Sequence, residues 1–196
     1  MYTEHNWGPG MYQSSMSRMT AFDLSNLQIL VVEDNKNTQF LVREVLRLLR
    51  VPAIQMVEDG EAAQQVLESF APDIIITDWA MGPMNGLEFT TWLRRDENLP
   101  NPFVPVIMLT AHTGYAHVME AINHGVNEFL AKPISVSSLY QRLVTVIERP
   151  RLFVRAGEYV GPDRRRRGND PSSDGPKRRE SDHPPADKAE ARAAET

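Results

Sequence analysis

Apolar residues recur along residues 27–148 in two alternating patterns, short continuous runs and longer segments with helical spacing. The short runs predict buried strands over residues 27–32, 51–57, 73–78, 103–110 and 127–133. Helical spacing predicts helices over residues 38–50, 60–70, 86–95, 115–125 and 135–148. Strands that alternate with helices favour a parallel sheet with right-handed crossovers and helices on both faces. We therefore expect an α/β fold of five strands and five helices.

The pattern also predicts details of single helices. In the first helix the apolar spacing places several large side chains on one stripe, namely Phe40, Leu41, Val45, Leu48 and Leu49. Gly125 is typical of the position that follows a helix, and Ser135 is typical of the residue that caps a helix at its start.

The regular pattern is confined to the middle of the chain. Residues 1–22 show neither a strand nor a helix period, and we interpret them as a flexible N-terminal extension. The ordered domain is expected over residues 25–149. The apolar period fades after Glu148, and residues 161–196 are dense in proline, glycine, serine and charge. We therefore expect residues 150–196 to form a mostly disordered basic and polar tail.

Charge and composition narrow the class of protein. Residues 1–150 carry 10 Lys+Arg against 17 Asp+Glu, so the body is acidic and unsuited to general nucleic-acid binding. The chain has no cysteine and no apolar stretch near the ~18 residues that span a bilayer. Residues 1–22 lack the charged start and apolar core that are typical of a secretory signal. We expect a soluble cytoplasmic protein without membrane contact.

Polar residues follow the predicted strands where a parallel sheet binds its ligands, at the carboxyl ends. They are Glu33 and Asp34 after the first strand, Asp78 after the third, Thr110 after the fourth and Lys132 after the last. Each residue alone is explained by a turn or a solvated surface. Three carboxylates about 5 Å apart would repel by about 3 kcal/mol per pair at an effective dielectric of 20. A hard divalent cation relieves that repulsion, and all-oxygen ligands suit Mg²⁺ or Mn²⁺.

Five segments carry a resemblance to a known family: "ILVVEDN", "DGEAA", "DIIITDWAM", "VIMLTAH" and "EFLAKP". As an ordered set they resemble the motifs of the two-component response-regulator receiver domain, in its stand-alone, CheY-like form. The resemblance covers about residues 25–148. It implies a flavodoxin-like doubly wound fold with strand order 2-1-3-4-5.

The resemblance implies a role for each residue of the predicted site. Asp78 would be the phosphoacceptor. Mg²⁺ would be held by Glu33, Asp34, Asp78 and the backbone carbonyl of Ala80. Thr110 and Lys132 would contact the phosphoryl oxygens, Phe129 would be the aromatic switch residue, and the Lys132–Pro133 bond would be cis. In the loop "WAMGPMNG" Gly82 stands where many family members have proline, which changes the loop near Ala80.

The implied function is that of a phosphorelay response regulator without a folded output domain. A histidine kinase or a histidine phosphotransfer protein would donate the phosphoryl group, and signal would leave through contacts with an output protein whose identity the sequence does not give. Such a protein is not an enzyme, because it catalyses only its own phosphorylation and dephosphorylation.

Two other classes remain open from the residues alone. A Mg²⁺-dependent phosphohydrolase also uses an aspartate nucleophile on a parallel sheet, although it usually has a D-x-D motif where this chain has "VVEDNKN". A nucleic-acid binder could act through the four arginines at 164–167, although nine acids share the segment 151–196. The arginine run could equally serve an output contact or solubility alone.

Overall fold

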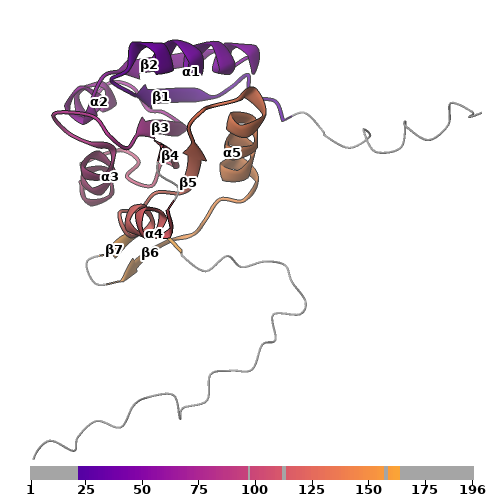
Figure 1. The fold of residues 1–196 in the computed structure, drawn as a ribbon. Helices are drawn as coiled ribbons and strands as arrows, with labels where there is room; N and C mark the ends of the chain where they lie inside the picture. The colour runs from indigo at the N-terminus through magenta and orange to yellow at the C-terminus, as the bar shows by residue number, and fades with distance from the viewer. Residues whose placement is uncertain (1–21, 97, 112–113, 157–158, 164–196) are drawn as a thin grey trace, which may run out of the picture. The chain divides into compact units, whose positions relative to one another are not determined.

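The five predicted strands form one parallel sheet (Figure 1). The computed structural model describes residues 22–163, apart from 97, 112–113 and 157–158. The strands are β1 (Gln28–Val32), β2 (Ala53–Val57), β3 (Ile74–Asp78), β4 (Val106–Thr110) and β5 (Glu128–Ala131). They lie in the order β2-β1-β3-β4-β5, which confirms the predicted doubly wound α/β topology.

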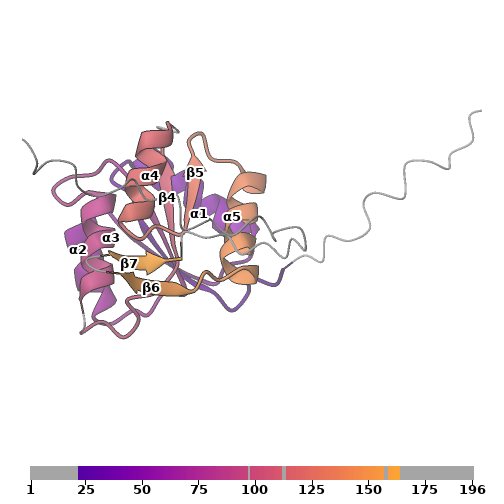
Figure 2. The same cartoon turned by 90° about the horizontal axis from the view of Figure 1, so that it is seen from below.

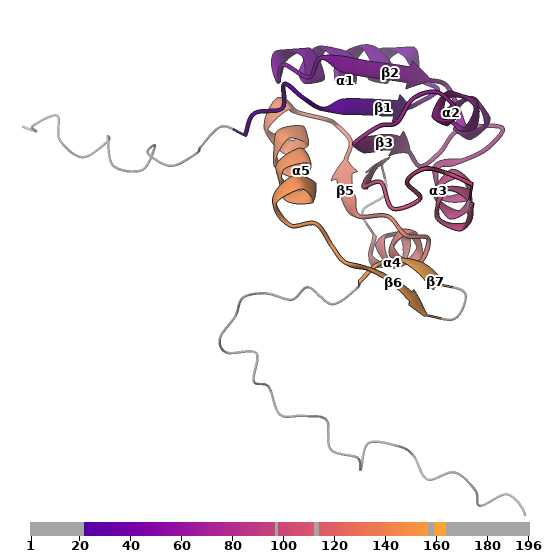
Figure 3. The same ribbon diagram turned by 180° about the vertical axis from the view of Figure 1, so that it is seen from behind.

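A helix follows each strand of the sheet. The helices are α1 (Lys36–Leu48), α2 (Gly60–Leu67), α3 (Gly86–Arg95), α4 (Tyr115–Asn123) and α5 (Val136–Glu148). Helices α1 and α5 cover one face of the sheet, and α2, α3 and α4 cover the other, as Figures 1 and 3 show from opposite sides.

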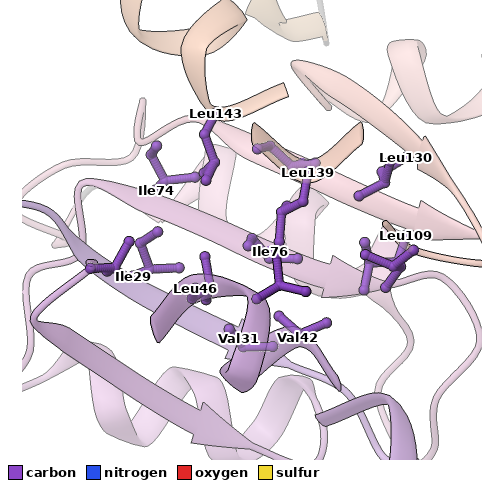
Figure 4. Close-up of a cluster of buried hydrophobic side chains, with 14 of the residues drawn as sticks. Ile29, Val31, Val42, Leu46, Ile74, Ile76, Leu109, Leu130, Leu139 and Leu143 are labelled. Carbon is purple, nitrogen blue, oxygen red and sulfur yellow. The ribbon is translucent and has the colours of Figure 1, made fainter. Parts of the chain in front are cut away.

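The alternation of side chains along the strands divides the core into two layers. Ile29 and Val31 of β1 point toward α1 and α5, whereas Leu30 and Val32 point toward α2, α3 and α4. Figure 4 shows the first layer, in which side chains from the sheet meet Leu46 of α1 and Leu139 of α5. Because both faces are covered, the central strands are apolar on both sides and their register is fixed.

The predicted apolar stripe of α1 is wrong in part. The helix buries Gln39, Val42, Val45 and Leu46. Of the predicted stripe only Val45 is buried, with Leu49 partly buried against the same layer, and the three others are exposed: Phe40 by 66%, Leu41 by 41% and Leu48 by 71%. The buried face is therefore rotated from the predicted stripe, and it includes a polar residue, Gln39.

The roles predicted for Ser135 and Gly125 at helix ends are confirmed. Ser135 caps α5 and forms a capping box with Ser138. Gly125 follows α4 with φ +88°, a conformation that only glycine adopts without strain.

A β-hairpin follows α5, and the sequence pattern did not predict it. Strand β6 (Phe153–Ala156) pairs antiparallel with β7 (Tyr159–Pro162). Strand β7 contacts α3 and α4, and Figure 2 shows the hairpin beside these helices. The approach is close: a Cβ added at Gly125 would lie 3.0 Å from the carbonyl oxygen of Val160. Residues 153–156 and 159–162 of the predicted disordered tail are therefore folded.

The side chain of Arg94, near the end of α3, joins the hairpin to the sheet. It is 3% exposed. Its guanidinium donates hydrogen bonds to the carbonyl oxygens of Gly125 and Pro102 and to the side-chain oxygen of Asn127. The same group lies 4.9 Å from the ring centre of Phe153 in β6. Burial lowers the pKa of Arg94 to about 9, so the group stays charged at neutral pH.

Two predicted segments lie mostly or wholly outside the described residues. They are the N-terminal extension, of which only residue 22 is described, and the part of the tail from residue 164 onward. Within the described ranges no helix has the length and apolar character needed to cross a bilayer.

Candidate functional site

Three carboxylates meet at the carboxyl ends of β1 and β3. Glu33 and Asp34 follow β1 directly, and Asp78 is the last residue of β3. Val32 pairs with Thr77 in the sheet, so the residue after each lies at the same edge. One oxygen from each of the three acids lies within 4.8 Å of the others. Glu33 is fully buried and Asp78 is 7% exposed, whereas Asp34 faces solvent.

Lys132 completes this cluster from the end of β5, which β4 separates from β3. It follows β5, and its ammonium nitrogen lies 2.9 Å from Oε2 of Glu33 and 2.9 Å from Oδ1 of Asp78. The predicted cis bond between Lys132 and Pro133 is present. One cation is therefore shared by two carboxylates that neighbouring strands bring together.

Thr110 lies at the same edge, while the structure says less about the other predicted residues. Thr110 ends β4, is 2% exposed, and accepts a hydrogen bond from the backbone N–H of Lys132 at 2.9 Å through its carbonyl oxygen. Phe129 pairs with Met108 in the sheet and packs partly buried against the α2–α4 layer. Ala80 is exposed in the loop after β3. The roles assigned to these three residues remain predictions.

Burial and mutual charge shift the pKa values of two groups in the cluster. Burial raises the pKa of Glu33 above its ordinary value, and the charge of Asp78 raises it further, against the effect of the hydrogen bond from Lys132. Burial alone would lower the pKa of Lys132, but hydrogen bonds to Asp78 and Glu33 and their charges together raise it. The site thus holds negative charge that one ammonium only partly offsets.

This donor set fits a hard divalent cation. All three candidate ligands are carboxylates, and their oxygens are close enough to bind one ion. Neither cysteine nor histidine belongs to the group. Mg²⁺ prefers such oxygen ligands and is commonly held by one or two carboxylates together with water. Glu33, Asp34 and Asp78 are therefore the residues that would hold Mg²⁺.

The start of α3 fixes the backbone beneath Asp78. A Cβ added at Gly86 would lie 2.0 Å from the carbonyl oxygen of Asp78, so only glycine allows this approach. The N–H of Gly86 also donates to the carbonyl oxygen of Trp79 at 3.1 Å. Asn85 and Glu88 form a capping box that sets where α3 begins. The Trp79 ring, one residue from Asp78, contacts His117 of α4 edge-on with ring centres 5.7 Å apart.

Two residues near the site were missed in the sequence. Gly86 carried a visible signal, because a glycine that opens a helix is unfavourable unless its backbone is needed. Gln39 carried none, since a polar residue on a helix is expected in solvent. It is 7% exposed, and its side-chain amide donates to the carbonyl oxygen of Glu33 at 2.5 Å.

The ordered motifs, the strand order and the acid–lysine cluster are those expected of one family. The sequence model of the response regulator receiver domain matches residues 29–144. The chain belongs to the response regulator receiver domain family. The matched part of this receiver domain reaches from β1 into α5, so the hairpin β6–β7 lies beyond it.

Curated relatives of this receiver domain include chemotaxis proteins. Chemotaxis protein CheY-3 of Vibrio cholerae is 33% identical over 131 residues, a match that covers 67% of this chain and 99% of that protein. Chemotaxis protein CheY of Pseudomonas aeruginosa is 31% identical over 123 residues, covering 63% of this chain and 98% of that protein.

Solved structures of other receivers share the fold. The receiver domain of a sensor histidine kinase from Pseudomonas aeruginosa is 32% identical with a TM-score of 0.54, covering 61% of this chain and 94% of that one. It was crystallised with a magnesium ion coordinated in its active-site cleft. CheY4 of Vibrio cholerae is 26% identical with a TM-score of 0.56, covering 61% of this chain and 98% of that one.

Proposed function

We propose that this receiver domain accepts a phosphoryl group on Asp78 in a phosphorelay, with Mg²⁺ bound by Glu33, Asp34 and Asp78. One observation carries the proposal: three carboxylate oxygens within 4.8 Å of one another, with Lys132 2.9 Å from two of the acids. Receiver family membership and the magnesium ion in a related receiver support it.

Asp78 would be the nucleophile. One of its carboxylate oxygens attacks the phosphorus of the donor, in line with the bond from phosphorus to a histidine nitrogen of the donor. That bond breaks, its electron pair stays on the nitrogen, and Asp78 becomes an acyl phosphate. Burial at 7% exposure keeps bulk water from the carboxylate, so the step depends on positioning and on charge neutralisation.

The neighbouring groups would neutralise and recognise the transferred phosphoryl group. The ammonium of Lys132, already 2.9 Å from Asp78, offsets charge on the phosphoryl oxygens. The hydroxyl of Thr110 at the adjacent strand end supplies a neutral donor. Bound Mg²⁺ supplies positive charge at the acids, and the carbonyl oxygen of Ala80 is its predicted fourth protein ligand.

Signal would leave through protein contacts. Phe129 lies partly buried on β5, next to β4, which carries Thr110, so a rearranged Thr110 would change the space available to its ring. The donor is predicted to be a histidine kinase or a phosphotransfer protein, and the output partner a protein rather than DNA. A cytoplasmic location remains a prediction.

Acetyl phosphate with Mg²⁺ tests the proposal, because it offers a phosphoryl group without a partner protein. We expect one phosphoryl group per chain, mapped to Asp78 by mass spectrometry, and none in the Asp78→Asn variant. Asp96→Asn, which changes an acid beyond the far end of α3, is the matched control and should label normally. Undiminished labelling of Asp78→Asn at another residue would refute the assignment. Sustained turnover of phosphomonoesters would favour a phosphohydrolase instead.

A further inference from the structure

We propose that Gln39 is a positioning residue, which holds the turn carrying Glu33 and Asp34 in the conformation that binds the metal ion. This inference rests on the proposed function, because it concerns the same site. The juxtaposition that carries it is a buried side-chain amide of α1 against the backbone carbonyl of Glu33.

The amide of Gln39 contacts two strand ends at once. Its nitrogen lies 2.5 Å from the carbonyl oxygen of Glu33 and 3.5 Å from that of Val57, the last residue of β2. The backbone N–H of Glu33 also donates to the carbonyl oxygen of Val57, at 3.0 Å. Gln39 and the Glu33 backbone therefore converge on one carbonyl and tie the end of β1 to the end of β2.

The hydrogen bond from Gln39 to Glu33 is made just beyond the last residue of β1. The strand β1 ends at Val32, so the carbonyl of Glu33 lies beyond the pairing of β1. The carbonyl of Glu33 and the N–H of Asp34 belong to one planar peptide group. Fixing that plane therefore limits the backbone dihedrals on both sides of it. One amide side chain thus constrains two of the three proposed metal ligands.

Hydrogen bonds fix the first turn of α1, which carries Gln39. The side chain of Asn35 caps α1 by accepting hydrogen bonds from the backbone N–H groups of Asn37 and Thr38. The N–H of Gln39 donates to the carbonyl oxygen of Asn35 at 2.9 Å, which closes the first turn of the helix. The N–H of Asn35 in turn lies 3.3 Å from Oε1 of Glu33. The turn between β1 and α1 is therefore held from both sides.

A purely structural role for Gln39 makes a different prediction. A buried amide that only satisfied two carbonyl groups would contribute to stability, and its loss would leave the affinity for Mg²⁺ unchanged. A positioning role predicts weaker Mg²⁺ binding, because the acids lose their fixed orientation. Removing groups that orient metal ligands lowers metal affinity by about 10- to 100-fold.

The experiment measures Mg²⁺ affinity without phosphoryl transfer. The chain has three tryptophans, and Trp79 adjoins Asp78, so fluorescence is read in a protein whose Trp7 and Trp92 are phenylalanine. We expect Gln39→Met, which keeps the side-chain length but donates no hydrogen bond, to raise the apparent Kd for MgCl₂ about tenfold. Gln39→Asn, which keeps the amide but is one methylene shorter, should also bind more weakly and serves if the Met variant does not fold.

Val42→Ala is the matched control. Val42 is fully buried on the same helix and contacts the core rather than the acids. It should lower the melting temperature and leave the Kd for Mg²⁺ as in the parent protein. Labelling by acetyl phosphate gives a second measurement: the half-saturating Mg²⁺ should rise in Gln39→Met, while the maximal rate is retained.

The outcomes separate this inference from the proposed function. If the parent protein binds Mg²⁺ and folded Gln39 variants bind it equally well, the positioning role is wrong and the residue is structural. The same conclusion follows if the maximal labelling rate falls while the half-saturating Mg²⁺ stays unchanged. If the parent protein itself binds no Mg²⁺ and takes no label, the proposed function fails first.

Discussion

Lys132 reaches Asp78 across the end of an intervening strand. Lys132 follows β5 and Asp78 ends β3, with β4 between them, yet their charged atoms are 2.9 Å apart. Thr110 ends β4, so the predicted phosphoacceptor and the two residues predicted to contact its phosphoryl group lie at three consecutive strand ends. Lys132 therefore offsets part of the charge of Glu33 and Asp78 even without a metal ion.

Replacing Lys132 by methionine should make the fold more dependent on Mg²⁺. Without the ammonium, Glu33 and Asp78 are left with uncompensated charge, and we expect the metal-free protein to lose about 2 kcal/mol of unfolding free energy. Added Mg²⁺ should restore more stability in Lys132→Met than it adds to the parent protein. Urea unfolding with and without Mg²⁺ measures both the loss of unfolding free energy and the stability that Mg²⁺ restores.

The control for this experiment is Lys36→Met. Lys36 forms an exposed pair with Glu58, and exposed pairs contribute little to stability. Equal Mg²⁺ stabilisation of the parent and Lys132→Met proteins would contradict the shared-charge interpretation.

The raised pKa of Glu33 predicts a pH dependence of stability. Because its pKa is above the ordinary value in the folded state, the folded protein holds this proton more tightly than the unfolded chain does. Its contribution to stability is therefore largest at low pH and falls as pH rises from about 4, near the ordinary value, through the raised pKa. In metal-free buffer, Glu33→Gln should become more stable relative to the parent protein as pH is raised to neutrality.

Thermal unfolding across this pH range gives the comparison. Glu61→Gln, on the exposed side of α2, serves as the control and should show no such trend. A constant difference between the Glu33→Gln and parent proteins from acid to neutral pH would show that burial of the Glu33 charge does not affect stability.

Two glycines that follow Asp78, Gly82 in the loop and Gly86 at the start of α3, should respond differently to alanine. In Gly86→Ala the new Cβ would lie 2.0 Å from the carbonyl oxygen of Asp78, so the backbone must move. We expect a loss of about 1–3 kcal/mol of stability and slower labelling, since Asp78 is displaced. Gly82→Ala places its Cβ in open space and should change neither quantity. Chemical denaturation and acetyl phosphate labelling of both variants test the difference, and equal behaviour would disprove the close approach.

The adjacent arginines of α3 form a second matched pair. Arg94→Met removes three hydrogen bonds, two of them buried, and the contact with the Phe153 ring, and we expect about 3 kcal/mol of lost stability. Arg95 is exposed, so Arg95→Met should stay within about 0.5 kcal/mol of the parent protein. Hydrogen exchange should show faster exchange of the β6–β7 amides in Arg94→Met only. Unchanged protection there would mean that Arg94 does not hold the hairpin.

The sheet and most of the acid cluster could be predicted because their signals are local. A continuous apolar run predicts a covered strand, and parallel strands place the residues after their ends at one edge. This is sufficient for Asp78, which ends such a run, and for Glu33, which follows another. These local signals do not predict that the side chains of Lys132 and Glu33, which are far apart in the sequence, come into contact.

The buried face of α1 and the hairpin could not be predicted in the same way. Counting apolar residues favoured Phe40 and Leu48, but the helix buries Val42, Val45 and Leu46. It buries Gln39 with them, and the amide of Gln39 contacts two backbone carbonyl groups. Strands β6 and β7 have four residues each, too short for a clear period. They are stabilised by Arg94, and a charged residue near a helix end gives no sign in the sequence that it will be buried.

The hairpin β6–β7 also determines which part of the receiver a protein module fused to its C-terminal side would be attached to. The family match ends at residue 144, near the end of α5, whereas the described fold continues to Asp163, whose N–H donates to the carbonyl oxygen of Leu152 at 2.6 Å. A chimaera joined at residue 148 would lack Phe153, whose ring lies against the guanidinium of Arg94. A chimaera joined after residue 163 would instead inherit a linkage through β7, whose Val160 carbonyl lies against Gly125 at the end of α4. Its fused module would thus follow a strand that contacts α3 and α4, and would not be attached through α5 alone.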